Sequence, residues 1–153
     1  MTTSRSDPAN ALTRNLPMPE PRFEPLPFGF GAQVVGVRLS NPVDAELGES
    51  LRRALPRHRL LLFRGQALTA FEQVAVAECF GRLRNGTANR RYPSEHSKVD
   101  YVSNIDRGGR FLDRNPDPHS AFWHSDGSWA KTPPKATLLY ADQAPKSGGE
   151  TRF

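Results

Sequence analysis

The sequence lacks several features that would place it in a specialised class of protein. It has a single cysteine, Cys79, in 153 residues, which excludes an internal disulfide. No run of eighteen apolar residues is present, so no membrane-spanning helix is expected, and no apolar segment typical of a secretory leader follows the N-terminus. We therefore expect a soluble protein of the reducing cytoplasm that has no membrane partner.

Lysine is also scarce, with four residues against seventeen arginines, and the formal net charge is +5. A basic chain can bind nucleic acid by releasing counterions from phosphates. The arginines are scattered from Arg5 to Arg152, however, and no zinc-finger or aromatic RNP pattern accompanies them. We expect no nucleic-acid partner, and a basic nucleic-acid-binding module is kept as an alternative that salt-sensitive binding would reveal.

The first 22 residues differ in composition from the rest of the chain. Residues 1–22 contain four prolines among polar residues and show no periodicity, which predicts a disordered or loosely attached tail. Strand and helix patterns begin at Phe23. The chain thus divides into a tail and one folded unit over residues 23–153.

The folded unit opens with a strand pattern and a helix pattern. Residues 33–39 place Val35, Val37 and Leu39 on one face at the two-residue period of a strand. A stripe with helical spacing follows, and Pro56 is expected to end that helix because proline has no amide hydrogen to donate. The stripe consists of Leu47, Leu51, Ala54 and Leu55.

A second strand and helix come next. The continuous apolar run at 59–64 predicts a central strand buried on both faces. Thr69 and Glu72 have the spacing of a capping box, which predicts a helix that extends to about Phe80 and stops at Gly81. Apolar side chains surround much of the circumference of this helix and predict that it is largely buried. They are Phe71, Val74, Val76, Cys79 and Phe80. Further strands are expected at 99–103, 136–141 and 150–153, a hairpin turn at 106–111, and long loops at 82–97 and 113–121.

A histidine and a carboxylate lie two residues apart in the segment 122–129. In an extended backbone, His124 and Asp126 would project from the same face with their Cα atoms about 6 to 7 Å apart. One neutral nitrogen and one anionic oxygen make two of the three ligands in the two-histidine, one-carboxylate triad that suits iron(II). The triplet alone fits equally a surface pair or a structural histidine.

Several separated motifs place this triplet in a wider pattern. They resemble, in order and spacing, a family of iron(II)- and 2-oxoglutarate-dependent dioxygenases that includes taurine dioxygenase and aryloxyacetate dioxygenase. The motifs lie at 29–32, 36–39, 62–66, 68–69, 80–81, 123–129, 133–134, 137–139 and 145–151. The resemblance implies that His124 and Asp126 are metal ligands, and that the cofactors are Fe(II) and 2-oxoglutarate with O2 as cosubstrate.

The same resemblance implies further site residues. Thr151 is similar in position to the threonine whose hydroxyl contacts a carboxylate of 2-oxoglutarate, although plain β propensity would also explain it. Ser120 and Asn104 align near the substrate, where a solvated loop serine and a turn-forming asparagine are the simpler interpretations. Arg84 follows the second helix where a taurine dioxygenase has a histidine, which argues against taurine and allows an arginine to attract another anion.

The resemblance also implies a fold and a reaction. The expected fold is mostly β with flanking helices, an α+β class in which residues 23–153 form the N-terminal portion of a double-stranded β-helix, or jelly roll. The reaction would couple conversion of 2-oxoglutarate to succinate and CO2 with hydroxylation of a small organic acid such as an aryloxyacetate, sulfonate or sulfate ester. The family's second histidine ligand and its 2-oxoglutarate-binding arginine are expected beyond Phe153.

A chain that holds only part of such a site has an alternative interpretation. It could be a catalytically inert fragment or an interaction partner that requires another chain. Half of a β-helix would expose strand edges and an unpaired apolar face, so the isolated chain is expected to aggregate. The substrate and the homo-oligomeric state of a full-length parent are left open by the sequence.

Overall fold

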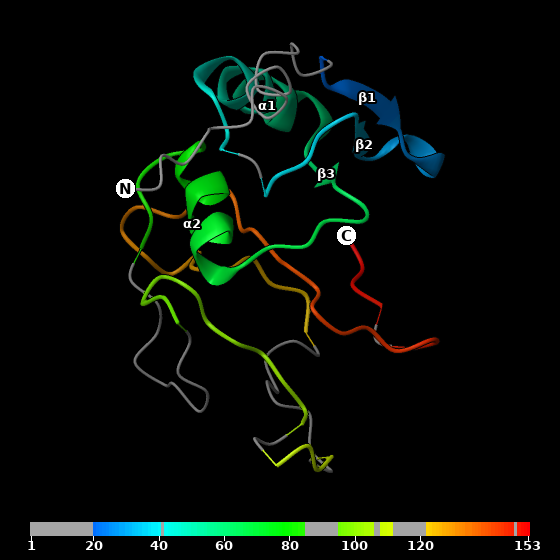
Figure 1. The fold of residues 1–153 in the computed structure, drawn as a ribbon, viewed down its shortest axis with the longest axis vertical. Helices are drawn as coiled ribbons and strands as arrows, with labels where there is room; N and C mark the ends of the chain where they lie inside the picture. Colours follow the sequence, from blue (N-terminus) through cyan, green and yellow to red (C-terminus); the bar gives the residue numbers. More distant parts are fainter. Residues whose placement is uncertain (1–19, 41, 85–94, 106–107, 112–121, 149) are drawn as a thin grey trace, which may run out of the picture.

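The computed structural model describes residues 20–40, 42–84, 95–105, 108–111, 122–148 and 150–153. Its regular elements are, in chain order, β1 (Arg22–Pro25), the 3-10 helix η3 (Pro27–Gly29), β2 (Ala32–Val35), α1 (Ala45–His58), β3 (Leu61–Leu62) and α2 (Ala70–Glu78). Figure 1 shows α1 and the sheet at one end of the molecule, with α2 below them. Residues 1–19 of the expected tail lie outside the described ranges.

The three strands form one sheet in the order β1-β2-β3. β2 pairs antiparallel with β1 and parallel with β3, where Ala32 faces Leu61 and Gln33 faces Leu62. The prediction of a central strand at 59–64 is therefore wrong. This segment supplies a two-residue edge strand, since β2 already has a partner on each side and no other described strand pairs with β3.

The segment that begins with β2 buries a different set of side chains from the predicted one. Val35 is only half-buried, so the expectation that it shares a face with Val37 is wrong. Gly36 has a φ of +86°, a left-handed conformation that glycine adopts without steric cost, and it shifts the alternation by one residue. The buried residues of this segment are Ala32, Val34, Val37 and Leu39.

Helix α1 extends two residues past Pro56, so the prediction that Pro56 ends the helix is wrong. Its N-terminus is capped by the Asp44 carboxylate, which accepts from the Leu47 amide at 2.7 Å. Its C-cap is Arg59, which has a φ of 66° and donates its amide to the Leu55 carbonyl at 2.7 Å. A proline in the last turn forfeits only one helical hydrogen bond, and the left-handed residue after it ends the helix.

The capping box that was predicted for α2 is confirmed. The Glu72 amide donates to Thr69 Oγ1 at 3.2 Å, and the Thr69 amide donates to Glu72 Oε2 at 2.7 Å. Val74 and Val76 are buried, whereas the Phe71 side chain is 61% exposed. The expectation of a largely buried helix is therefore wrong for Phe71, which shares an exposed stripe with Ala75 and Glu78. Val74 and Val76 lie about 200° apart around the helix, so α2 packs on more than one face.

The core lies where both helices meet the β2 segment. Leu51 of α1 and Val76 of α2 are fully buried, at 0% exposure. Their buried neighbours in the cluster are Val34, Val37 and Leu39. Leu138, from the distant segment after the His-x-Asp motif, also packs against this cluster. A hydrogen bond of 3.3 Å from the Leu68 amide to the Tyr140 hydroxyl further attaches that segment to the chain before α2.

Polar contacts join α1 to the end of α2. Arg52 donates through Nη1 to the Cys79 carbonyl at 2.8 Å and forms an ion pair with Glu49 at 2.8 Å. A Cβ on Gly48 would lie 3.6 Å from the Cys79 sulfur, so the helices approach each other closely at this point. Partial burial raises the pKa of the Cys79 thiol, which makes this cysteine a poor nucleophile.

After α2, the described residues form no helix or strand. The strands expected at 99–103, 136–141 and 150–153 are therefore absent there, since an extended segment becomes a strand only with a hydrogen-bonded partner. A single antiparallel bridge between Ile105 and Phe111 is consistent with the expected hairpin, although 106–107 are not described. Residues 85–94 and 112–121, which hold most of the two expected loops, also lie outside the described ranges.

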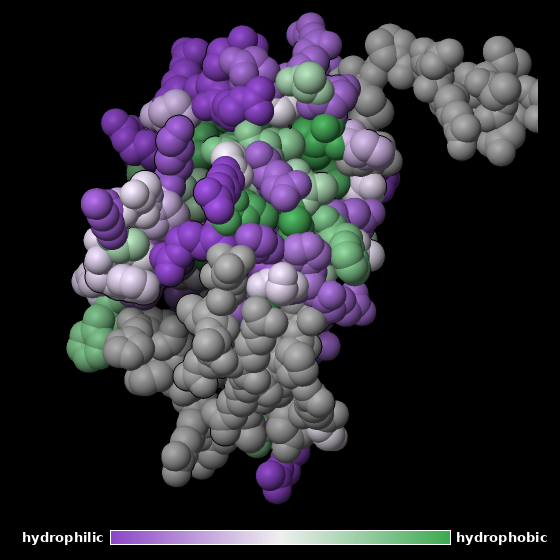
Figure 2. Space-filling model, turned by 90° about the vertical axis from the view of Figure 1, so that its left-hand side faces the viewer, coloured by the Kyte–Doolittle hydropathy of each residue, from purple (hydrophilic) through white to green (hydrophobic). Residues whose placement is uncertain are grey.

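The expectation of an α+β mixture is confirmed in the described part of the chain, with three short strands and two α-helices. The expectation that the fold is mostly β is wrong for that part, because the helices contain 14 and 9 residues and the strands 4, 4 and 2. No helix in these ranges combines the length and apolarity needed to cross a bilayer. Hydrophobic residues remain visible between hydrophilic ones on the face shown in Figure 2. Large exposed apolar residues after α2 include Val102, Phe111, Phe122, Trp123, Trp129, Leu139 and Phe153.

The Gln66 side chain satisfies backbone groups just beyond β2. Its carbonyl oxygen accepts from the Leu39 amide at 2.8 Å, and its amide nitrogen donates to the carbonyls of Val37 at 3.2 Å and Arg64 at 3.0 Å. The bonds to Leu39 and Val37 are part-buried, whereas the bond to Arg64 is exposed. Gln66 thus takes the place of a neighbouring strand along this stretch.

We predict that Gln66→Ala lowers the free energy of unfolding by about 1 to 3 kcal/mol, because it leaves part-buried amide and carbonyl groups unsatisfied. Urea denaturation followed by circular dichroism measures this loss. Gln73→Ala, a glutamine truncation on α2, is the control. Equal midpoints for the two variants would contradict the role given to Gln66.

The capping box predicts an acid-sensitive contribution to stability. The hydrogen bond from the Thr69 backbone, followed by the one from its side chain, holds the pKa of Glu72 below its usual value. Because the folded-state pKa is depressed, this contribution is present above the unfolded-state pKa and is lost as the pH falls through the folded-state value. Glu72→Gln should flatten the loss of thermal stability below pH 5, whereas Glu78→Gln on the same helix should follow the wild type.

Candidate metal centre

The segment that carries the His-x-Asp motif lacks regular structure at first and then turns. Residues 123–125 have no regular structure, and a turn occupies 126–129. The Ser128 amide donates to the Ser125 carbonyl at 3.3 Å, and the Ala130 amide donates to the Gly127 carbonyl at 3.0 Å. Gly127 has a φ of +62°, which a residue without a Cβ adopts easily. This turn sets the direction of the Asp126 side chain relative to His124.

The His124 and Asp126 side chains converge. Nε2 of His124 lies 3.4 Å from Oδ1 of Asp126, and the two side chains are 47% and 52% exposed. Two ligand atoms about 2.1 Å from a shared divalent ion lie about 3.0 to 3.4 Å apart at octahedral or tetrahedral angles. The spacing of this pair therefore fits two adjacent positions around one ion that solvent can reach.

A backbone carbonyl orients the imidazole ring. Nδ1 of His124 lies 2.7 Å from the Phe122 carbonyl oxygen. A carbonyl can only accept, so Nδ1 donates, and in the neutral ring the lone pair remains on Nε2, the nitrogen that faces Asp126. Metal-binding histidines commonly have this arrangement, in which a hydrogen bond from the other ring nitrogen fixes the tautomer.

His124 and Asp126 are the two candidate metal ligands of this cluster, and the described part of the chain adds no third one. Among the described residues, no set of three histidine, cysteine or acidic side chains is close enough to hold a metal ion. In the absence of metal, a protonated His124 would form an exposed ion pair with Asp126, an interaction of small energy. The pair therefore accounts for part of a metal centre, and additional ligands would have to come from other groups.

The remaining predicted site residues are not joined to this pair by any hydrogen bond or ion pair in the described part of the chain. Thr151 is exposed, and two residues later Phe153 stacks on Phe30 with ring centroids 6.2 Å apart. Asn104 is exposed in a bend beside Ile105. Ser120 lies outside the described residues.

The structure adds contacts that the motif itself does not reveal. The Arg84 guanidinium lies over the Trp129 ring, with Cζ 5.0 Å from the ring centroid. Arg84 also approaches Gly127 closely, because a Cβ added to Gly127 would lie only 2.5 Å from Arg84 Nη1. No local sequence pattern connects Arg84 with Trp129, because they are far apart in the sequence. The Phe122 carbonyl that orients His124 is a backbone group, so patterns of side chains could not predict its role either.

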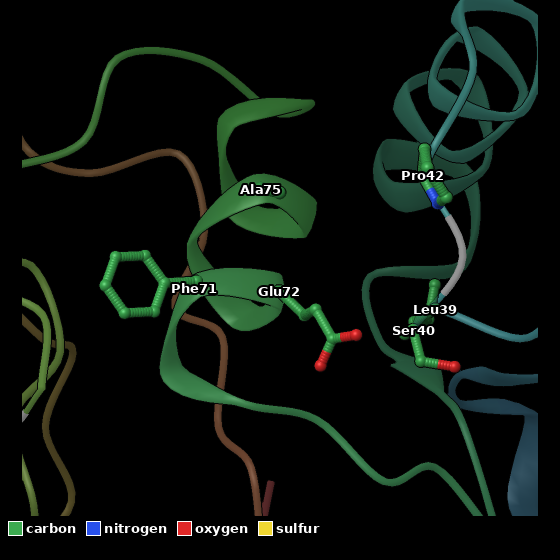
Figure 3. A pocket seen from close by; sticks show the side chains of 6 residues that line it. All are labelled: Leu39, Ser40, Pro42, Phe71, Glu72 and Ala75. Atoms are coloured by element: carbon green, nitrogen blue, oxygen red, sulfur yellow. The ribbon is translucent and has the colours of Figure 1, made fainter. Parts of the chain in front are cut away.

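A pocket of about 280 Å³ lies between α2 and the connection from β2 to α1. As Figure 3 shows, Glu72 points towards Leu39 and Ser40 across this pocket, whereas Phe71 points away from it. The Glu72 carboxylate is already bound by Thr69 at the start of α2. The pocket lining is mostly apolar and includes none of the predicted site residues.

A histidine and an aspartate that converge from one loop match two of the three protein ligands of mononuclear non-haem iron oxygenases. The family profile described as "Taurine catabolism dioxygenase TauD, TfdA family" matches residues 22–153. The chain belongs to this family of iron(II)- and 2-oxoglutarate-dependent dioxygenases.

Individual relatives agree with the family assignment. The alpha-ketoglutarate-dependent sulfate ester dioxygenase of Pseudomonas putida is 33% identical over 131 residues, which is 83% of this chain and 39% of the relative. The alpha-ketoglutarate-dependent 2,4-dichlorophenoxyacetate dioxygenase of Cupriavidus pinatubonensis is 30% identical over 133 residues, which is 81% of this chain and 46% of the relative. The chain thus spans less than half the length of these two relatives.

A solved structure shows a partial likeness. The crystal structure described as that of an alpha-ketoglutarate-dependent taurine dioxygenase from Burkholderia xenovorans is 31% identical, with a TM-score of 0.46, over 50% of this chain and 28% of that protein. The family assignment rests on the sequence match, which extends over far more of the chain.

Proposed function

We propose that this chain supplies His124 and Asp126 as two ligands to iron(II) in a 2-oxoglutarate-dependent dioxygenase that hydroxylates a small organic acid. The observation that carries the proposal is the 3.4 Å approach of Nε2 to Oδ1. The hydrogen bond from Nδ1 to the Phe122 carbonyl supports it, since that bond leaves Nε2 free to coordinate. Membership of the family makes iron(II) and 2-oxoglutarate the fitting cofactors.

Each residue of the pair has a distinct task in this proposal. His124 donates a neutral nitrogen lone pair, and Asp126 supplies a negative charge that offsets part of the charge of the metal. Iron(II), when bound with 2-oxoglutarate and O2, supplies the oxidising chemistry that hydroxylates a substrate carbon and releases succinate and CO2. The half-exposed position of the pair leaves space for these small molecules to approach.

An anionic substrate is the best-supported class. The relatives from Pseudomonas putida and Cupriavidus pinatubonensis are named for a sulfate ester and for 2,4-dichlorophenoxyacetate, which both carry an anionic group on a small organic molecule. The net charge of +5 favours the approach of such an anion. We place Ser120 and Asn104 near this substrate and Thr151 on a carboxylate of 2-oxoglutarate.

The domain that carries this site is proposed to be larger than the described elements. Residues 23–153 would form the N-terminal portion of a double-stranded β-helix, preceded by a tail at 1–22. The chain aligns with 39% to 46% of the lengths of the two relatives compared above. A third protein ligand and a cation for the far carboxylate of 2-oxoglutarate would come from outside the described residues.

A second candidate function is an inert chain that requires another polypeptide. The exposed aromatic side chains after α2 favour it, since Phe122, Trp123 and Trp129 are each at least 74% exposed. Exposed apolar groups of this size commonly mark a surface that another chain covers. This alternative predicts no consumption of 2-oxoglutarate, with or without added iron.

We predict that His124→Ala and Asp126→Ala each weaken binding of Mn(II), a redox-stable substitute for Fe(II), by at least about tenfold, because each removes one of two protein ligands. Isothermal titration and the electron paramagnetic resonance signal of free Mn(II) would measure the change. His58→Ala and Asp142→Ala remove the same residue types outside the pair and should bind as the wild type does. Unchanged affinity in both ligand variants would contradict the proposed metal site.

We predict that Thr151→Val weakens 2-oxoglutarate binding to the metal-loaded protein by about tenfold while Mn(II) affinity stays unchanged. The substitution keeps the shape of the side chain and removes one hydroxyl that would bind a charged carboxylate. Thr137→Val, at another exposed threonine, is the matched control. Equal 2-oxoglutarate affinity in the two variants would remove Thr151 from the site.

A further inference from the structure

Arg84 lies against the turn that follows the Asp126 carboxylate. Its guanidinium carbon is 5.0 Å from the centroid of the Trp129 ring, inside the range of about 6 Å for a cation–π interaction. Arg84 belongs to the segment after α2, whereas Trp129 closes the turn at 126–129. The contact therefore connects two parts of the chain that are distant in sequence.

Gly127 provides the space for this contact. A Cβ at this position would lie 2.5 Å from Arg84 Nη1 and 3.0 Å from Pro134 Cδ, so the glycine is held between the arginine and the proline. Its φ of +62° is also a conformation that other residues adopt at a cost. The residue directly after Asp126 is thus fixed on both sides.

We propose that Arg84 is a positioning residue that holds the turn at 126–129, and through it the Asp126 carboxylate, in the orientation that meets His124. Its effect on metal binding rests on the proposed function, whereas its effect on the turn does not. The turn has few other restraints, since its two backbone hydrogen bonds are 3.3 and 3.0 Å long and its side chains are mostly exposed. The cation–π contact with Trp129 adds a restraint from outside the turn.

The chemistry of arginine suits this task. Among the described residues, no carboxylate forms an ion pair with Arg84, so the face of the Trp129 ring is the partner that orients the guanidinium. A planar guanidinium can lie flat on an indole ring and still contact the backbone of the neighbouring residue. A lysine ammonium keeps the charge and loses the planar stacking.

The first test measures the turn without any metal. In a Trp123→Phe background, Trp129 is the only tryptophan, and its time-resolved fluorescence anisotropy reports the local motion of the turn. Arg84→Ala and Gly127→Ala should both increase the amplitude of fast motion, and Arg84→Lys should restore part of the order. Arg82→Ala removes an exposed arginine two residues earlier and is the matched control. Equal motion in Arg84→Ala and Arg82→Ala would overturn the proposal.

The second test measures the metal site with Mn(II) alone. Arg84→Ala should weaken Mn(II) binding by about tenfold, as is typical for residues that orient metal ligands, while Arg82→Ala leaves it unchanged. Trp129→Leu should weaken binding to a similar degree. The Arg84→Ala/Trp129→Leu double variant should bind no more weakly than either single variant, because both remove one contact. Additive losses, or no loss in Arg84→Ala, would overturn the positioning role.

The two tests separate the failure of this inference from the failure of the proposed function. If the wild-type chain binds no Mn(II), the proposed function fails for this chain, and the anisotropy still decides whether Arg84 holds the turn. If the wild type binds Mn(II) and Arg84→Ala binds equally well with a more mobile turn, the proposed function stands and the positioning role is wrong.

Discussion

The fully buried contact of Leu51 and Val76 with the β2 segment is the packing constraint on which the described structure depends. Leu51 comes from α1 and Val76 from α2, so both helices are placed by the same apolar surface. Because the contact is dry, its stabilisation scales with the apolar area that leaves water. β3 follows α1 after a short connection and joins β2 in parallel, so the helix position also sets the register of the edge strand.

The candidate metal centre is tied to this core through its neighbours. Leu138 packs on the core cluster and the Tyr140 hydroxyl accepts from the Leu68 amide, which anchors the chain after the motif. Arg84, just after α2, contacts the turn itself. His124 and Asp126 thus lie on an exposed loop whose surroundings are attached to the packed helices, an arrangement that keeps ligands accessible while limiting their motion.

Predictions that depend on neighbouring residues agreed best with the structure. The capping box of Thr69 and Glu72 formed as its spacing indicated, because both hydrogen bonds close within one helical turn. Predictions that required a partner elsewhere were less successful. Residues 59–64 have the composition of a central strand, and yet β2 took the central place. Val35 does not share a face with Val37, because the backbone turns at Gly36 and interrupts the two-residue period on which the prediction was based.

The sequence by itself determined that the Cα atoms of His124 and Asp126 lie within about 7 Å of each other, since two residues of backbone limit their separation. The turn at 126–129 decided that the two side chains converge, with Nε2 3.4 Å from Oδ1. It also determined the family, through ordered motifs along most of the chain. Only the tertiary structure decided that Arg84 meets Trp129 and that Leu138 reaches the core. The physical reason is that spacing along the chain fixes local geometry, whereas contacts between distant segments depend on how the whole set of apolar side chains packs.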